Sequence, residues 1–206
     1  MVLITGFGPY REDMNASGVL VRSLKEDLPT TLDHLKDLLA FEVVTCDDTS
    51  RETEHLSLEN QLDELLRRHE PELCIHTGQA PPYNKIMVER IATNSFMREV
   101  IDPGRPVAYW SNLPGTEGLS VALEAHNIPA GNSFYAGQHL CNHILYSSRY
   151  FAEKNALPHK SGFIHVPVLP EQARHHRDAP TMPLDMSRKA LSIIISQVVK
   201  AHRLQE

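Results

Sequence analysis

The sequence is poor in cysteine and contains no long hydrophobic run. Its 206 residues include three cysteines, Cys46, Cys74 and Cys141, at wide spacings. An odd number of widely spaced cysteines fits neither a disulfide framework nor paired thiolate ligands for zinc. Nowhere do eighteen apolar residues run together, and no basic leader with a long apolar segment opens the sequence. We therefore expect a cytoplasmic protein without a membrane partner.

Clusters of basic residues and metal-ligand spacings are also missing. The formal charge is -6 and the Lys and Arg residues are scattered, so the sequence offers no patch for phosphates and predicts no nucleic-acid partner. Twelve histidines raise the question of a metal site, because His139 and His143 flank Cys141 and His175 adjoins His176. Positions two apart on a helix point to different sides, and the other histidines lack ligand spacing. We predict no metal and no cofactor.

The sequence does contain short apolar runs that alternate with helical periodicity. A length of 206 residues suits a single domain over residues 1–206 with a sizeable core. Continuous apolar runs ended by glycine or proline are typical of buried parallel strands, so the order predicts an α/β fold. Strands are expected at residues 2–5, 41–44, 73–76 and 161–166, with Gly78 ending the third, and helices at residues 16–28, 49–66, 119–127 and 190–198. The second helix is expected to open on a capping box formed by Thr49 and Glu52.

The segment at residues 136–147 places Cys141 behind a glycine, at the predicted start of another helix. The unpaired N–H groups and the dipole of a helix start favour an anion, so a thiolate forms there more readily than in water. The same spacing is also typical of a small apolar residue that fills the inner face of a helix beside Leu140, Ile144 and Phe151. On this segment alone both interpretations stay open.

Two further residues are unusual for their surroundings. Glu89 lies in the apolar run at residues 86–92, where a carboxylate is costly to bury without a partner; an exposed edge strand or an ion pair with Arg90 is the alternative. His165 lies in the last apolar strand, either as a satisfied core residue or as a base for a thiol. With Cys141 they provide the nucleophile, base and orienting carboxylate of a triad.

Five separated motifs give the chain a resemblance to a known family. They are TGFGPY at residues 5–10 with NAS at 15–17, HTGQA at 76–80, VERIATN at 88–94, AGQHLCN at 136–142, and SGFIHVP at 161–167 with PEQ at 170–172. Each motif is weak alone, but the set in this order resembles the pyroglutamyl peptidase type I family, also called pyrrolidone carboxyl peptidase. These cysteine peptidases remove an amino-terminal pyroglutamyl residue.

The resemblance implies a three-layer α/β/α sandwich with a central mixed, mostly parallel sheet. It places the catalytic residues of the family on Glu89, Cys141 and His165. It also implies that a pocket for the five-membered lactam is lined by Phe7 and Tyr10, with Gln79 close by; the residues alone equally suit Phe7 and Tyr10 as aromatics that cover the core. The substrates implied are peptides with an N-terminal pyroglutamate, and the assembly implied is a homo-oligomer, a tetramer or a dimer.

The sequence departs from the family pattern in several places. The segment between Asn94 and Tyr109, expected to be an exposed loop up to residue 106, is about a dozen residues shorter than in many relatives by inspection. An arginine of that segment is thought to assist the oxyanion in the family, and Arg98 is the nearest candidate, one position out of step. His139 replaces an aromatic, and Arg11 with Glu12 replaces glycines. These departures leave a second hypothesis, a catalytically impaired pyroglutamyl-peptide binding protein.

Overall fold

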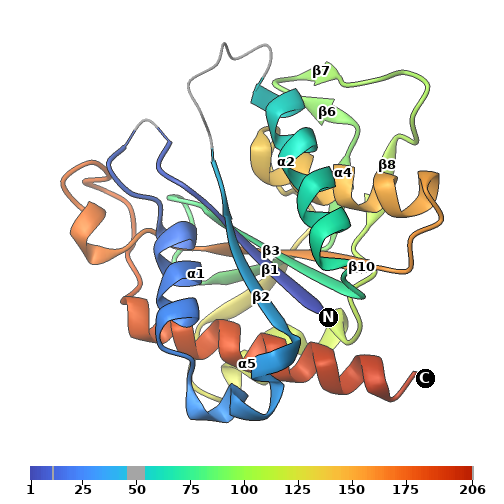
Figure 1. The fold of residues 1–206 in the computed structure, drawn as a ribbon. Helices are drawn as coiled ribbons and strands as arrows, with labels where there is room; N and C mark the ends of the chain where they lie inside the picture. Colours follow the sequence, from blue (N-terminus) through green and yellow to red (C-terminus); the bar gives the residue numbers. More distant parts are fainter. Residues whose placement is uncertain (11, 46–53, 206) are drawn as a thin grey trace.

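The computed structural model describes residues 1–10, 12–45 and 54–205 (Figure 1). The predicted capping box of Thr49 and Glu52 lies outside the described residues, as do Cys46 and Arg11.

Six strands form the central sheet, in the order β2-β1-β3-β10-β4-β9. Their bounds are Val2–Phe7 for β1, Leu39–Val44 for β2, Leu73–Gln79 for β3, Ile86–Glu89 for β4, Ala130–Ser133 for β9 and Lys160–Val166 for β10. Strands β4 and β10 are antiparallel, whereas every other neighbouring pair is parallel. The predicted mixed, mostly parallel sheet is confirmed.

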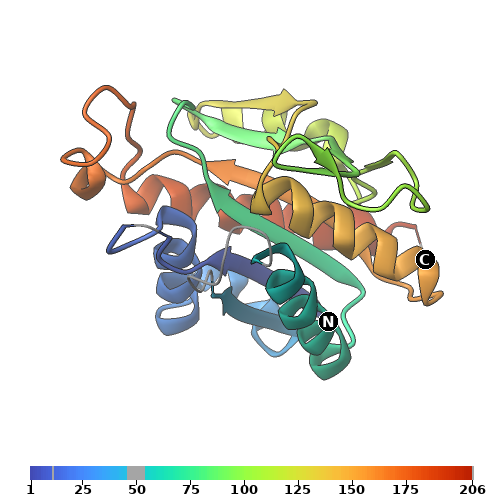
Figure 2. The same cartoon turned by 90° about the horizontal axis from the view of Figure 1, so that it is seen from above.

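Helices cover both faces of this sheet (Figures 1 and 2). One face carries α1 (Ala16–Glu26), α3 (Leu119–Glu124) and α5 (Leu184–Arg203), and the other carries α2 (Glu54–His69) and α4 (Leu140–Lys154). Short 3-10 helices η1, η2 and η3 span Thr30–Leu38, Thr116–Gly118 and Pro170–Gln172. The three-layer sandwich is therefore confirmed. No helix in the described part of the chain is long and apolar enough to cross a membrane.

Strand alternation divides the apolar side chains between two cores. In β1, Val2 and Ile4 pack with the α1 and α5 side, whereas Leu3 and Phe7 pack with the α2 and α4 side. Every residue of β1 is buried, which explains its continuous apolar run. Asn15 caps α1, as predicted, because its side chain accepts from the Ser17 N–H at 3.0 Å.

The segment at residues 94–106 is mostly exposed, as expected, but it is more ordered than a loop and it buries Asn94 and Phe96. It contains a hairpin of β6 (Ser95–Phe96) and β7 (Glu99–Val100), and β5 (Ile91–Thr93) before it pairs with β8 (Ala108–Trp110). The buried Asn94 side chain donates to the Asp102 carbonyl at 2.6 Å. Short-range polar bonds of this kind hold a segment that has no apolar periodicity.

Other elements also differ from the predictions, and three of these differences have a clear cause. β9 was missed because Ala-Gly-Asn-Ser at residues 130–133 has no strand pattern; its pairing with β4 along the sheet edge supplies the order. β3 continues past Gly78 to Gln79, since that glycine pairs with His165 within the ladder. α3 ends at Glu124 rather than near residue 127, where Asn127 has a left-handed φ of 59°.

Candidate active site

Strand register gathers the predicted residues on the sheet face that α4 covers. In β10, Phe163 lies opposite Glu89 of β4, and His165 lies opposite Gly78 of β3. Phe163 and His165 are two positions apart, so their side chains leave the same face of the sheet. The His165 Nδ1 is 2.7 Å from the Glu89 Oε1. The carboxylate and the imidazole predicted to cooperate are thus in direct contact.

Glu89 is completely buried, and its partner is His165. The alternatives of an exposed edge strand and of an ion pair between Glu89 and Arg90 are wrong. Arg90 instead bonds Glu117 across 2.8 Å. A buried carboxylate needs a charged or hydrogen-bonded partner, and the Glu89 side chain has found one 76 positions away.

Cys141 occupies the second position of α4, after the N-cap residue His139. The first bond of the helix ladder runs from the His143 N–H to the His139 carbonyl, so the N–H groups of residues 140–142 precede the ladder. Cys141 is half-buried, whereas Ile144 on the inner face of the helix is fully buried. Cys141 therefore packs against the core on the α4 side of the sheet and is less buried than Ile144.

Gly78 makes room for the sulfur of Cys141. A Cβ atom at this position would stand 2.8 Å from the Cys141 Sγ and 2.6 Å from the Phe163 Cζ. Both distances are shorter than van der Waals contact, so any side chain here would push the nucleophile or the ring away. The strand glycine lets the helix approach the sheet closely.

The neighbours of His165 favour its protonated form. Burial acts most strongly and lowers the pKa of His165, because it penalises the charged imidazolium. The charge and hydrogen bond of Cys141, followed by those of Glu89, outweigh burial and raise the pKa of His165 to about 9. The ring of Phe163 stands edge-on to the imidazole at 4.8 Å between centroids. This arrangement suits an imidazolium that lies between a carboxylate and the Cys141 sulfur.

Cys74 provides an internal comparison for Cys141. It is completely buried in β3, and burial raises the pKa of its thiol to about 12, against smaller opposing hydrogen bonds from Ser148 and Ser161. A thiol with so high a pKa is not a nucleophile near neutral pH. The prediction that Cys74 is inert core is confirmed.

The carboxyl ends of β1 and β3 bring Phe7 and Gln79 to the same edge of the sheet. Continuing the β1–β3 register, in which Thr5 lies opposite His76, sets Phe7 level with Gly78. Phe7 is buried, and the Gln79 Oε1 accepts from the Ala16 N–H at 2.8 Å and from the Gln172 Nε2 at 2.7 Å. These two bonds fix the Gln79 carbonyl toward α1 and η3, so its amide donors face elsewhere.

Tyr10 lies beside the N-cap residue of α4, whereas Arg98 is exposed on the β6–β7 hairpin. Tyr10 is half-buried and its ring centroid is 5.5 Å from that of His139, the N-cap residue of the nucleophile helix. Arg98 is exposed at the turn of the β6–β7 hairpin, with a left-handed φ of 73°. The preceding residue, Met97, donates its N–H to the Gln138 carbonyl at 2.8 Å, which ties the hairpin to the approach of Cys141. Whether Arg98 assists the oxyanion stays a prediction.

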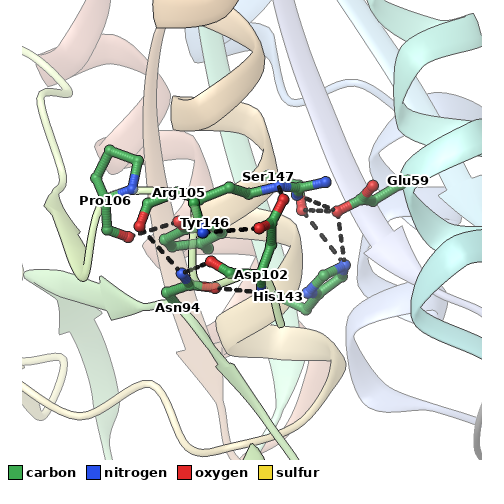
Figure 3. A network of polar contacts seen from close by, with 9 residues as sticks. Glu59, Asn94, Asp102, Arg105, Pro106, His143, Tyr146 and Ser147 are labelled. Atoms are coloured by element: carbon green, nitrogen blue, oxygen red, sulfur yellow. Dashed lines mark hydrogen bonds and ion pairs between the residues drawn. The ribbon is translucent and has the colours of Figure 1, made fainter. Parts of the chain in front are cut away.

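A second polar network lies farther along α4 (Figure 3). Glu59 of α2 accepts from the Arg105 Nη1 at 2.9 Å and from the Ser147 hydroxyl at 3.1 Å, and its Oε1 is 3.3 Å from the His143 Nε2. Arg105 belongs to the segment at residues 94–106, and the Tyr146 hydroxyl of α4 donates to the backbone carbonyl of residue 106 at 2.6 Å. The segment at residues 94–106 is thereby fastened to α4. Within the described residues, no group of three or more His, Cys, Asp or Glu side chains could hold a metal ion.

Three residues that shape the surroundings of Glu89, Cys141 and His165 were not predicted from the sequence. Gly78 was interpreted as a strand end, although an isolated glycine within a strand also signals close approach of another backbone or side chain. Phe163 was identifiable from its position two residues before His165 on the same face. The Asn142 side chain accepts from the Thr93 N–H at 2.8 Å and donates to the Thr93 carbonyl at 2.9 Å, a pairing between distant segments that had no local signal.

Comparisons with known proteins agree with this geometry. The chain is 30% identical over 213 residues to pyrrolidone-carboxylate peptidase 1 of Caldanaerobacter subterraneus subsp. tengcongensis, covering 97% of this chain and 98% of the relative. It is 32% identical to a pyrrolidone-carboxylate peptidase of Bacillus thuringiensis, covering 94% of this chain and 90% of the relative. The structure matches that of pyrrolidone carboxyl peptidase from Pyrococcus furiosus with a TM-score of 0.83 at 28% identity, over 97% of this chain and 98% of the other.

A family model supplies the remaining comparison. The model of the pyroglutamyl peptidase family matches residues 1–201. Since the match extends over nearly the whole chain, this protein belongs to the pyroglutamyl peptidase family of cysteine-type hydrolases.

Proposed function

We propose that this protein hydrolyses the amide bond after an N-terminal pyroglutamyl residue through a thioester on Cys141, with His165 as base and acid and Glu89 as the orienting carboxylate. The observation that carries the proposal is the 2.7 Å contact between His165 and Glu89, which leaves the other imidazole nitrogen for Cys141. A carboxylate at one nitrogen and a nucleophile at the other is the arrangement that proton transfer requires.

The reaction proceeds in two halves. The Cys141 sulfur attacks the pyroglutamyl carbonyl carbon, and the N–H groups at the start of α4 stabilise the oxyanion that forms. His165 then gives its proton to the departing nitrogen; the C–N bond breaks, and a thioester and a free amine result. A water molecule gives a proton to His165 and attacks the thioester carbon. Collapse of the second intermediate breaks the C–S bond, releases pyroglutamate and leaves the Cys141 sulfur beside the protonated His165.

The pocket that we assign to the lactam is built from Phe7, Tyr10 and Gln79. A pyroglutamyl residue has no charged amine, so apolar walls and a neutral amide suit it. An ordinary amino terminus would lose its water there without gaining a counter-charge. The proposal therefore includes selectivity for peptides with N-terminal pyroglutamate. It also includes a cytoplasmic setting and a homo-oligomer, a tetramer or a dimer, as the family resemblance implies.

The test is release of aminomethylcoumarin from its pyroglutamyl amide. We expect the wild type to cleave this amide and to leave the corresponding prolyl amide, which has a charged ring nitrogen, intact. Cys141→Ala should lose activity by about 10⁴-fold or more, because the nucleophile is absent. Cys74→Ser is the matched control, since it changes a buried cysteine outside the triad.

Retained hydrolysis in the Cys141→Ala protein would contradict the thioester mechanism. Saturable binding of pyroglutamate without turnover in the wild type, even at high enzyme concentration, would favour the binding protein instead. Iodoacetamide supplies an independent measurement: peptide mass analysis should find the label on Cys141 and not on Cys74, with activity lost in proportion.

A further inference from the structure

Tyr83 is an aromatic residue whose ring contacts the catalytic histidine. Its ring centroid is 5.7 Å from that of His165, with the planes at 64°. Tyr83 is half-buried, so the residue keeps some solvent-exposed surface while its ring contacts the imidazole. The ring of Phe163, at 4.8 Å from that of His165, is completely buried. Of these two rings, Tyr83 is therefore the one that a bound molecule can reach.

The backbone holds Tyr83 firmly beside the site. The Ala80 N–H donates to the Val166 carbonyl at 2.9 Å, which extends the β3–β10 ladder by one residue beyond β3. The Tyr83 N–H then donates to the Ala80 carbonyl at 3.1 Å and closes a turn over Pro81 and Pro82. Two prolines restrict the backbone of this turn, so little conformational entropy remains to be lost when Tyr83 packs against a ligand.

The chemistry fixes where the departing residue must lie. The Nδ1 of His165 is engaged by Glu89, so the Nε2 is the nitrogen that exchanges protons with Cys141 and with the departing amine. A general acid has to come within hydrogen-bonding distance of the atom it protonates. The nitrogen of the residue after pyroglutamate is therefore about 3 Å from the His165 ring during bond cleavage. Its side chain begins one atom farther on, and Tyr83 is the half-buried aromatic residue that contacts the same imidazole.

We propose that Tyr83 is a specificity residue that forms the subsite for the side chain following the pyroglutamyl residue and favours a large apolar or aromatic side chain there. This inference rests on the proposed function, because it uses the same scissile bond. The Tyr83 ring provides an apolar surface, and aromatic pairs gain stacking or edge contacts beyond simple area burial. An alanine at that substrate position is too short to make such contacts.

The experiment compares two substrates, pyroglutamyl-phenylalanine amide and pyroglutamyl-alanine amide, in the wild type, Tyr83→Ala and Tyr83→Phe. The wild type should prefer the phenylalanine substrate, and Tyr83→Ala should reduce the ratio of the two kcat/KM values by about tenfold, chiefly through KM. Tyr83→Phe should keep the ratio, because the ring and not the hydroxyl makes the contact. Tyr135→Ala, at an exposed tyrosine of another loop, is the matched control and should keep it too.

The ratio separates specificity from damage to His165, since both substrates require the same proton transfers. An equal loss on both substrates in Tyr83→Ala, or an unchanged ratio, would overturn the subsite. Calorimetric titration of the two amides into Cys141→Ala, with and without Tyr83→Ala, measures the same preference without turnover. Absence of hydrolysis in the wild type would thus defeat the proposed function, whereas equal binding of both amides by Cys141→Ala would defeat the role of Tyr83.

Discussion

Two carboxylate–histidine pairs lie on the face of the sheet that α4 covers. One pair joins strands β4 and β10, and the other joins helices α2 and α4. Glu89 contacts His165 at 2.7 Å, and Glu59 contacts His143 at 3.3 Å. A hydroxyl also lies beside the second pair, because the Ser147 Oγ is 3.3 Å from the His143 Nε2. By residue type alone the second pair, with its serine, resembles a Ser–His–Glu triad as closely as the first resembles a Cys–His–Glu triad.

Geometry distinguishes the two. Glu89 uses the Nδ1 of its histidine and leaves the Nε2 for the nucleophile, whereas Glu59 and Ser147 both lie at the Nε2 of His143. The Nδ1 of His143 is buried and has no hydrogen-bond partner among the described residues. In a triad the carboxylate holds one imidazole nitrogen while the other nitrogen takes the proton of the nucleophile, and His143 meets Glu59 and Ser147 through the same nitrogen. The second cluster therefore lacks the geometry of a triad, and its contacts join α2, α4 and Arg105.

The two carboxylates, Glu59 and Glu89, also differ in the charged partners that surround them. Burial is the largest influence on Glu59 and raises its pKa, but the hydrogen bonds and charges of His143 and Arg105 prevail and lower it to about 2. Glu59 shares its charge with an arginine, while the Glu89 Oε2 has no partner within the described part of the chain. The negative charge of Glu89 thus acts on His165. A carboxylate neutralised by arginine stabilises a structure; one directed at a histidine sets the protonation of a reacting group.

The largest expected difference between the clusters is the loss of kcat/KM when the glutamate of each pair is replaced by glutamine. Glu89→Gln should lower kcat/KM for a pyroglutamyl amide by about 10²–10⁴-fold, because the amide group stabilises imidazolium poorly and can hold the wrong tautomer. Glu59→Gln should leave kcat/KM close to that of the wild type. Steady-state kinetics of both variants, with circular dichroism to confirm folding, makes the comparison. Equal losses in the two variants would remove the distinction between the pairs.

The pH dependence should separate the clusters next. Because the pKa of His165 is raised from 6.5 to about 9, wild-type kcat/KM should fall by about tenfold per unit above pH 9, as the imidazolium that protonates the departing amine is lost. The same raised pKa means that His165 stabilises the folded protein fully below about pH 6.5 and that this contribution disappears as pH rises through 9. Glu89→Gln should move the alkaline fall in activity to lower pH, and Glu59→Gln should not. A profile that stays unchanged in Glu89→Gln would show that the carboxylate does not control His165.

The smallest effect is expected in stability. Glu59→Gln should reduce the free energy of unfolding by about 1–3 kcal/mol, because Arg105 and His143 lose their charged partner. The pKa of Glu59 is lowered from 4.5 to about 2, so its stabilising contribution is present above pH 4.5 and is lost as pH falls through 2. Urea unfolding at several pH values should show the difference from the wild type narrowing in that range. A constant difference down to pH 2 would assign the loss to packing rather than charge.

Much of this site was predictable because its residues carry local signals. The glycine turn before Cys141 predicts a helix start, and an isolated carboxylate in an apolar run predicts a buried partner. The segment at residues 94–106 and β9 had no such signal, since neither has apolar periodicity. Their order comes from contacts that periodicity does not reveal, namely the short-range bond of Asn94 to Asp102, the distant bonds of Asn142 to Thr93, and the pairing of β9 with β4.

The sequence by itself determined the alternation of strands and helices, the two apolar faces of the sheet and the chemical types at Glu89, Cys141 and His165. These follow from periodicity and from the cost of burying charge, which are local properties. The tertiary structure decided which histidine meets which carboxylate, and through which nitrogen. Strand register sets Glu89 and His165 together across 76 positions, and Gly78 admits the Cys141 sulfur beside them. Distances of this kind arise from the packing of whole elements, so the active pair and the structural pair differ only once the chain is folded.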